Sequence, residues 1–400
     1  MDIHNYVGKL EHACANLSTV ADISERNRDI LMKLAQHLII QNYSKPRIMK
    51  YIYTGRFVCR QFRKDYDKWT VDDVQQYLAW VHQRSRSPWT AQWYKVFIKR
   101  LMQFVHGMDG KEYPVLVSKI KLNFPSNLLK LPNEGELLTP EEVNKIIGAC
   151  KNSRDRAFVA TLYESGCRIS ELGNMTIKHV KFDQYGAVLS VIGKTGARQV
   201  RVINSTSYLS TWLHDHPLKN SRDMPLWVTI EGKRHLQVRY QRWRQLLMEL
   251  GTIAGIQKRV NPHSFRHARA TSLANHLTSF QMNQYLGWKQ GSDMASTYIH
   301  LSGKNTDSAL LKMYGLEKAE DKHDEIKPMR CPRCDGINPH GAQFCVKCGA
   351  VLNEVAAAEI DQKAVMTEQQ RIFGDKLMGI LLADPELMQL LKKKIAGVTS

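Results

Sequence analysis

The chain lacks any run of about 18 apolar residues, and this absence excludes a transmembrane helix. The stretch from Met1 to Leu10 lacks the apolar segment and the small-residue cleavage site of a signal peptide, so we expect the protein not to be secreted. It is therefore predicted to be cytoplasmic, with no membrane partner. At 400 residues the chain is also too long for a single hydrophobic core, which predicts two or three domains.

Acidic residues are scarce relative to basic ones, and this imbalance is confined to part of the chain. Residues 1–130 contain 21 Lys and Arg against 11 Asp and Glu, and residues 131–320 contain 25 against 16. Residues 321–400 contain 11 of each. Two consecutive basic segments favour a polyanionic partner, because each neutralised phosphate releases condensed counterions. Charge therefore predicts a polyanionic partner; the alternative is a basic surface that serves only solubility.

A disulfide framework is also missing, since half of the eight cysteines are scattered without a pairing pattern. The other half form two Cys-x-x-Cys pairs separated by ten residues: Cys331, Cys334, Cys345 and Cys348. Four thiolates at this spacing are typical of a structural Zn²⁺ site, because they fill a tetrahedron and leave no open position. Disulfides are the alternative, which a reducing compartment disfavours. The zero net charge of residues 321–400 favours contacts with a neighbouring protomer over strong DNA binding.

Helical periodicity dominates the first part of the chain. From Ser24 to about Val105 apolar residues recur at helical spacing and glycine is rare, which predicts four or so short helices with basic faces. Helix starts are expected at Ser44, Thr70 and Thr90. We interpret residues 1–122 as a helical DNA-binding domain and residues 123–138 as a linker.

A second domain is expected to begin at Thr139. Thr139 at the N-cap, Pro140 at the first helical position and Glu142 at the third form a capping box. Alternating segments at 180–183, 187–192 and 199–203 predict a small antiparallel sheet, and helices resume from about 238 to 316. The expected fold is mainly α with a small antiparallel β-sheet (α+β). Its further parts are a catalytic domain at 139–316, a linker at 317–330, a zinc ribbon at 331–352 and C-terminal helices at 353–400, with one start at Asp384-Pro385-Glu386.

Five short motifs supply, in one order, the parts of a metal-free phosphodiester transfer site; they lie at 166–172, 193–196, 261–267, 286–288 and 298–300. Tyr298 is the expected nucleophile, because a phenolate leaves again easily and the covalent intermediate is then reversible. Its alternative is a packed helical tyrosine. Arg168 and Arg266 are the expected clamp on two phosphate oxygens, since a guanidinium donates bidentately and keeps its charge. For a single arginine the alternative is a surface ion pair.

A histidine accompanies the second arginine. His263 lies three residues before Arg266, so on a helix the two side chains point the same way. His263 is expected to accept the tyrosine proton or to donate to the phosphate. His267 is the competing candidate, and because it follows Arg266 directly we expect it to point away from that face and to pack.

Three further side chains are expected to assist. Lys194 lies in a turn between two strands and is the expected general acid for the departing 5′ oxygen. Trp288 offers only an N–H donor, so it binds a phosphate oxygen, packs against the tyrosine helix, or does both. Glu171, one helical turn after Arg168, is expected to orient that arginine; a simple Arg–Glu helix pair is the alternative.

These motifs together resemble those of the tyrosine recombinase (phage integrase) family, over about residues 20–315. The resemblance implies a helical core-binding domain and a catalytic domain that clamp duplex DNA. It also implies four protomers that exchange strands through a 3′-phosphotyrosyl intermediate, without ATP or a catalytic cofactor. By similarity, the catalytic set is Arg168, Lys194, His263, Arg266, Trp288 and Tyr298. Many members have histidine where this chain has Trp288, and some have tryptophan.

Two other functions stay open besides a site-specific recombinase. A type IB topoisomerase shares the nucleophile chemistry but relaxes supercoils as a monomer; the helical domain before the capping box, without extensive lysine-rich linkers, favours the recombinase. A non-catalytic zinc-ribbon regulator on a recombinase scaffold is the other alternative. The presence of the whole catalytic set speaks against it.

Overall fold

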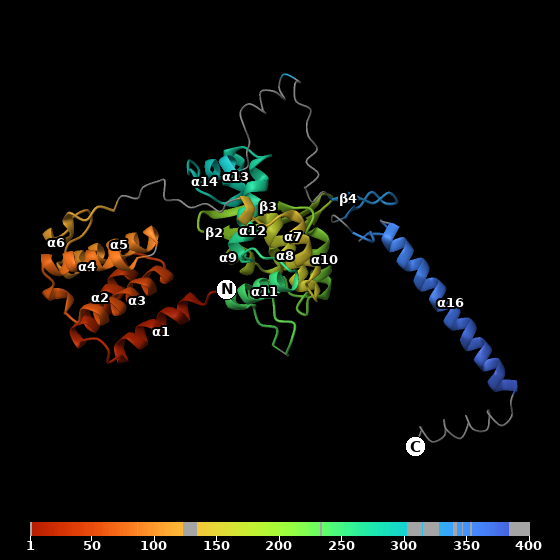
Figure 1. Cartoon of the computed structure of the whole chain (residues 1–400), viewed down its shortest axis with the longest axis horizontal. Helices are drawn as coiled ribbons and strands as arrows, with labels where there is room; N and C mark the ends of the chain where they lie inside the picture. The colour runs from red at the N-terminus through yellow and green to blue at the C-terminus, as the bar shows by residue number, and fades with distance from the viewer. Residues whose placement is uncertain are drawn as a thin grey trace, which may run out of the picture. The chain divides into compact units, whose positions relative to one another are not determined.

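The computed structural model describes residues 2–85, 87–122, 134–232, 234–301, 314, 328–338, 342–345, 347–352 and 354–383. The chain divides into two compact units, Met1–Gly135 and Glu136–Ser400 (Figure 1). Most of the predicted linkers at 123–138 and 317–330, and the helix start predicted at Asp384, lie outside the described residues. No helix among the described residues is both long and apolar enough to span a bilayer.

The first unit is helical throughout its described part. A single core gathers the apolar faces of its helices, with Tyr51, Tyr77 and Phe97 among its largest buried side chains. Its elements are α1 (Tyr6–Thr19), α2 (Glu25–Ile40), α3 (Lys45–Phe62), the 3-10 helix η1 (Tyr66–Lys68), α4 (Val71–Arg84), α5 (Pro88–Val105) and α6 (Val115–Ser118).

Of the three helix starts predicted in this unit, the structure confirms two and contradicts one. Thr70 caps α4, and a capping box joins it to Asp73. Ser44 stands at the N-cap of α3, but its side chain makes no capping hydrogen bond. The start predicted at Thr90 is wrong, because α5 already begins at Pro88, a residue whose fixed φ suits the first helical turn.

The second unit combines helices with a small sheet, as the fold-class prediction states. The capping box predicted at Thr139 is confirmed: its hydroxyl accepts from the Glu142 N–H, and the Glu142 carboxylate accepts from the Thr139 N–H. The first elements are the 3-10 helix η3 (Glu134–Glu136), which straddles the boundary between the units, α7 (Pro140–Gly148), α8 (Ser153–Ser165), α9 (Ile169–Gly173) and η4 (Ile177–His179).

The predicted antiparallel sheet is present, with the order β1-β2-β3. Its strands are β1 (Val180–Asp183), β2 (Gly186–Gly193) and β3 (Gly196–Val202). The helices that follow are α10 (Thr206–Asp215), which the sequence analysis missed, α11 (Tyr240–Ile253), α12 (Pro262–Ala274), α13 (Ser279–Leu286) and α14 (Met294–Leu301). Further on lie β4 (Met329–Arg330), β5 (Ile337–Asn338) and α16 (Glu354–Ala383).

Helix α8 forms the centre of the second unit, because all its residues from 157 to 165 are buried. One of them, Phe158, stacks on Trp243 of α11 with ring centroids 3.5 Å apart, and Trp227 meets both rings edge-on. Around the end of this helix, α12, α13 and α14 pack together with a second apolar cluster between them (Figure 1). The rigid core therefore fixes the segments that carry the predicted site residues.

Candidate active site

Helix α12 presents Arg266 to the interior of the second unit. Asn261 caps the helix by accepting from two backbone N–H groups, and Pro262 occupies the first turn. Arg266 is 7% exposed, and its guanidinium donates to two backbone carbonyls, Gly166 O and Leu286 O, each at 2.7 Å. Both terminal nitrogens of the Arg266 guanidinium group are thus fixed by hydrogen bonds.

Arg168 lies at the junction between α8 and α9. Gly166 ends α8 in the left-handed region at φ 57°, and Arg168 is the N-cap residue of α9. Its Nη1 donates to Glu171 Oε1 at 2.8 Å and to Gly287 O at 3.2 Å. The predicted pairing of Glu171 with Arg168 is therefore present in the structure.

Glu171 is shared between Arg168 and a third arginine, Arg198 of β3. Arg198 Nη2 donates to Glu171 Oε2 at 2.8 Å, and both side chains are buried. Burial alone would raise the pKa of Glu171, but the hydrogen bond and charge of Arg198 outweigh it and lower that pKa. Gly193 is needed beside this carboxylate, because a Cβ there would collide with Glu171 Oε1. Glu171 thus stays ionised between two guanidinium groups.

The three arginines converge on one stretch of backbone, the C-terminal end of α13. The acceptors, which we call the carbonyl triplet, are Tyr285 O, Leu286 O and Gly287 O; they accept from Arg198 Nε at 2.9 Å, from Arg266 and from Arg168, respectively. Carbonyls at a helix C-terminus lack intrahelical partners and carry partial negative charge. The end of α13 therefore satisfies its own acceptors and brings three cations into one place.

The sequence analysis missed Arg198. A signal was available, because side chains alternate along a strand and Arg198 shares its face with Val200 and Val202, which are fully buried. An arginine on a core-facing position requires partners. One of its nitrogens, Nη1, is buried with no hydrogen-bond partner among the described residues.

Tyr298 lies beside the arginines, within the cluster formed by α12, α13 and α14. Its ring stacks on Trp288, with centroids 5.3 Å apart and planes 9° from parallel, and the Arg266 guanidinium lies 5.4 Å from the Trp288 ring. Tyr298 is 2% exposed. Burial raises the pKa of its phenol, and the charge of Arg266 acts in the opposite direction. The packing expected of Trp288 is thus present.

His267 differs from its expected position. Its Nδ1 is 2.6 Å from the Tyr298 hydroxyl, so it does not turn away from the site. The expectation considered only its neighbour Arg266. On a helix, His267 also lies one turn after His263, and the two rings are 6.4 Å apart.

His263 and Lys194 are both exposed. Partial desolvation and the positive charges of Arg266 and Arg168 lower the pKa of His263. Lys194 lies at the β2–β3 turn, and its ammonium has no hydrogen-bond or ion-pair partner among the described residues. The next residue ties this turn to the site, since Thr195 Oγ1 donates to Gly287 O at 3.1 Å.

The charge of Arg266 persists despite its burial. Desolvation and the neighbouring Arg168 lower the pKa of Arg266 to about 10, which leaves it protonated at neutral pH. Glu171 offsets only part of the positive charge of the three arginines. The arrangement suits a group that carries negative charge, such as a phosphate.

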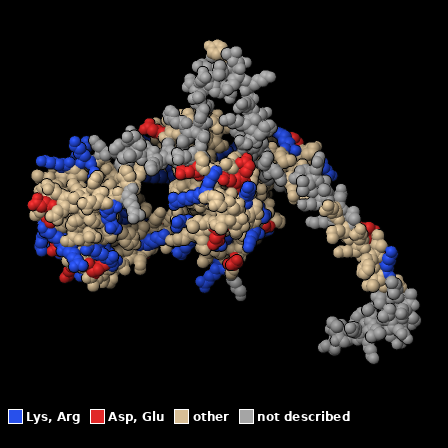
Figure 2. Space-filling model, in the orientation of Figure 1, with Lys and Arg blue, Asp and Glu red and all other residues tan. Residues whose placement is uncertain are grey.

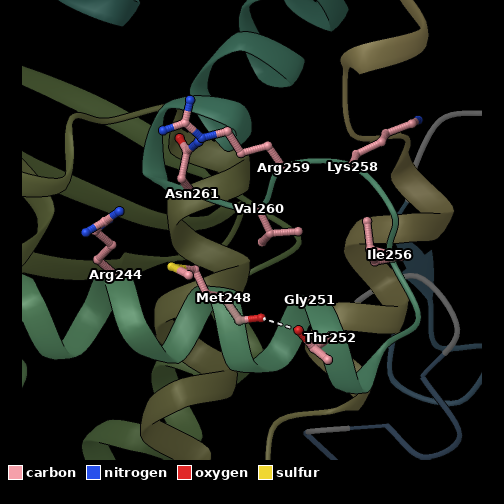
Figure 3. Close-up of a pocket in the computed structure, with 9 residues that line it drawn as sticks. All are labelled: Arg244, Met248, Gly251, Thr252, Ile256, Lys258, Arg259, Val260 and Asn261. Carbon is pink, nitrogen blue, oxygen red and sulfur yellow. Dashed lines mark hydrogen bonds between the residues drawn. The ribbon is translucent and has the colours of Figure 1, made fainter.

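A basic hollow of about 260 Å³ lies next to the start of α12 (Figure 3). Two arginines, Arg244 and Arg259, extend from its walls, and neither guanidinium has a hydrogen bond or ion pair within the described part of the chain. Lys258 differs, because it is bound to Glu142 and to Leu137 O. Figure 2 shows further Lys and Arg side chains on the visible face of both units, interspersed with Asp and Glu.

The four clustered cysteines lie within reach of one metal ion. Their sulfur atoms all lie within 4.8 Å of one another, and two of the separations are 3.7 Å (Cys331–Cys348) and 3.6 Å (Cys334–Cys345). A disulfide requires about 2.05 Å. A tetrahedron with Zn–S bonds of about 2.3 Å requires separations of about 3.8 Å between sulfurs, so the residues present fit Zn²⁺.

Comparisons with known proteins agree with this geometry. Residues 136–305 match the model of the phage integrase family. The tyrosine recombinase XerA of Pyrococcus horikoshii is 25% identical over 294 residues, which span 73% of this chain and 95% of that protein. XerD of Vibrio cholerae is 24% identical over 247 residues, which span 60% of this chain and 78% of that protein.

Solved structures share the fold. XerH site-specific recombinase in a pre-cleavage complex with its difH substrate has a TM-score of 0.53 at 16% identity, covering 78% of this chain and 95% of that chain. A lambda integrase dimer bound to a COC′ core site has a TM-score of 0.52 at 14% identity, covering 69% and 78%. Fold and relatives together define an enzyme of the DNA recombinase class. Residues 136–305 thus form a domain of the phage integrase family, and the similarity to tyrosine recombinases extends over 73% of the chain.

Proposed function

We propose that this protein is a site-specific recombinase that cuts and rejoins duplex DNA through a covalent 3′-phosphotyrosyl intermediate at Tyr298, without ATP. One observation carries the proposal: Arg266 and Arg168 bind consecutive carbonyls, Leu286 O and Gly287 O, directly before the tryptophan that stacks on Tyr298. Two fixed guanidinium groups and a phenol thereby share one small region. Transfer of a phosphodiester to a tyrosine requires these groups: a nucleophilic phenol and cations that stabilise the charge on the phosphate.

The remaining side chains take the roles expected from the sequence. Arg168 and Arg266 stabilise the charge on the phosphorus centre, with His263 and Trp288 as further donors. Lys194, exposed at its turn, gives a proton to the departing 5′ oxygen. Glu171 keeps Arg168 in place through their ion pair. The phosphoester bond energy is retained in the intermediate, so rejoining needs no nucleotide.

The proposed partner is double-stranded DNA. Both basic segments of the chain lie within the two described units, and Arg244 and Arg259 line an open hollow beside the helix that carries His263. XerH and lambda integrase are recorded in complexes with their own DNA sites. Binding is therefore expected to weaken steeply with salt, because phosphate contacts release counterions. A cytoplasmic, nucleoid-associated location follows from this partner.

We also propose a tetramer on two DNA sites, with α16 in a contact between protomers. Among its described residues the helix exposes five large apolar side chains, of which Met366, Phe373 and Leu377 lie on the same side. Light scattering of the DNA-bound protein should show a lower mass for a Phe373→Glu, Leu377→Glu variant. Neutralising Glu368 and Asp375, on the opposite side of the helix, should leave the mass unchanged.

The cysteine cluster is proposed to hold a structural Zn²⁺ ion. Two backbone amides support thiolates there, since the N–H groups of Arg333 and Lys347 donate to Cys331 Sγ and Cys345 Sγ, each at 3.4 Å. Four sulfur ligands leave no position for a substrate. Elemental analysis is expected to find one zinc per chain, lost in Cys345→Ser; a zinc content unaffected by that change would contradict the assignment.

The central experiment traps the covalent intermediate. A pool of duplexes of randomised sequence, each with a nick that releases the cut end, is incubated with the protein, and SDS-resistant adducts are recovered and sequenced. We expect the wild type to select one class of duplex and Tyr298→Phe to bind that duplex yet form no adduct. Adducts of equal yield in Tyr298→Phe would disprove the nucleophile. Relaxation of a plasmid that lacks the selected sequence would instead indicate a topoisomerase.

A further inference from the structure

We propose that His267 is the catalytic base that takes the phenolic proton of Tyr298 when the tyrosine attacks the phosphate. This inference rests on the proposed function of Tyr298. It assigns to His267 the role that the sequence left open to His263, and it leaves His263 as a donor to the phosphate.

Geometry is the first argument. Nδ1 of His267 is 2.6 Å from the Tyr298 hydroxyl, within the distance that proton transfer requires, and the two rings are 5.8 Å apart. His263 is exposed, and no hydrogen bond joins it to Tyr298 in the described part of the structure. Of the two histidines on α12, only His267 touches the reacting oxygen.

The surroundings of Tyr298 make this contact significant. The phenol is 2% exposed and stacked on Trp288, so water competes poorly for its proton. Burial raises the pKa of Tyr298, which means that the free phenolate is not populated at neutral pH. The nucleophile therefore needs a base that acts during the attack, and that base must already lie inside the cluster.

His267 is in the correct protonation state for this role. Burial, together with the charges of His263 and Arg266, lowers its pKa below the usual value of 6.5. The ring is thus neutral at neutral pH. In the tautomer that carries its proton on Nε2, Nδ1 has a free lone pair and the Tyr298 hydroxyl donates to it.

The step balances without a further reactant. As the bond between Tyr298 Oη and phosphorus forms, the bond between phosphorus and the 5′ oxygen breaks. The phenolic proton moves to Nδ1 of His267, and the 5′ oxygen receives a proton from Lys194. Rejoining reverses both transfers, so the imidazolium formed in cleavage becomes the acid that restores the phenol.

The test separates the base from the acid. His267→Asn places an oxygen near the position of Nδ1, which preserves the hydrogen bond but cannot hold the proton. On the selected nicked duplex, we expect single-turnover adduct formation to fall about 10²–10⁴-fold in this variant. His276→Asn, an exposed histidine just past the same helix, is the matched control and should cleave at the wild-type rate.

A second substrate sharpens the distinction. When sulfur replaces the bridging 5′ oxygen, the leaving group no longer needs a proton. Lys194→Ala should then recover most of its rate, whereas His267→Asn should not. A His267→Asn variant that cleaves within about threefold of the wild type, or that sulfur restores as fully as Lys194→Ala, would overturn the proposal.

A measurement without DNA provides an independent check. Nitrogen NMR of histidine-labelled protein should show His267 neutral and protonated on Nε2; protonation of Nδ1 in the neutral ring would exclude the proposed transfer. Failure of the proposed function has a different signature. In that case the wild type forms no adduct with any duplex, or Tyr298→Phe forms as much as the wild type.

Discussion

The arginines and the lysine of this site are held in opposite ways. Arg266 and Arg168 each donate to backbone carbonyls of the triplet at the end of α13, and Arg266 is almost fully buried. Lys194, by contrast, extends from an exposed turn and has no partner within the described residues. In the proposed mechanism, the groups that stabilise charge are therefore fixed before DNA binds, whereas the group that releases a proton is left free.

This difference follows from what each role demands. A donor aimed at developing negative charge is most effective when it need not reorganise during the reaction. The carbonyl triplet supplies that rigidity, because a helix end offers several acceptors in fixed positions. A general acid must exchange its proton with the leaving group and then with solvent, so an exposed turn suits it.

The largest effect on cleavage is expected from removing one of the arginines fixed by the carbonyl triplet. Arg266→Ala should slow cleavage about 10³-fold, since one preorganised donor is worth about 3–4 kcal/mol. It should also lower the free energy of unfolding by about 1–3 kcal/mol, because Gly166 O and Leu286 O lose their donor. Single-turnover cleavage and urea unfolding measure the two. Cleavage within about tenfold of the wild type would refute the clamp.

Lys194→Ala should affect only the chemistry. We expect cleavage to fall roughly 10²-fold, the lower end of the range for general acids, because an exposed turn is poorly preorganised. The melting temperature should not change, since Lys194 has no partner among the described residues to lose. A substantial loss of stability would show that the lysine is also fixed, and the contrast with Arg266 would disappear.

Arg198 tests whether the fixed geometry of the site depends on more than the two arginines that are proposed to bind the phosphate. Arg198→Ala leaves Glu171 bound to Arg168 alone and Tyr285 O with no donor among the described residues, so the free energy of unfolding should drop by about 3–5 kcal/mol. Cleavage by the folded fraction should fall about tenfold, as Arg168 loses the carboxylate's fixed position. Gly287→Ala provides a matched disturbance, because its Cβ would collide with the Arg198 guanidinium.

Much of the fold was predictable because its signals are local. The capping box at Thr139 and the alternation in β1 to β3 depend on residues a few positions apart, and the structure confirms both. Helix α10 was missed although Ser205 is a suitable residue type for its N-cap; the Ser205 hydroxyl donates to Glu164, 41 residues away, and does not cap the helix. The start of α5 was misplaced because Pro88 favours the first helical turn more strongly than Thr90 favours an N-cap.

The sequence predicted only those parts of the site that residue type and local spacing reveal. Residue type pointed to Arg168, Arg266 and Tyr298, and the structure brings them together, while their roles remain predictions. Neither Arg198 nor His267 was assigned a function, because their partners lie 87 and 31 residues away. The carbonyl triplet is invisible in sequence for the same reason: backbone acceptors carry no residue signature, and only tertiary packing aims them at arginines.

The smallest effect is expected from the hydrogen bond that links the Lys194 turn to the fixed arginines. Thr195 Oγ1 donates to Gly287 O, the same carbonyl that accepts from Arg168, so one hydroxyl ties the lysine turn to the locked arginines. Thr195→Val keeps the shape and removes one hydrogen bond worth about 0.5–1.5 kcal/mol. Gly287 O keeps its arginine donor, so stability should hardly change, while cleavage should slow by about three- to tenfold as Lys194 spends less time in reach. Thr195→Ser retains the hydroxyl and should cleave at the wild-type rate. If both variants behave like the wild type, the Lys194 turn adopts its position on DNA without the hydrogen bond from Thr195, and the lysine does not depend on the fixed arginines.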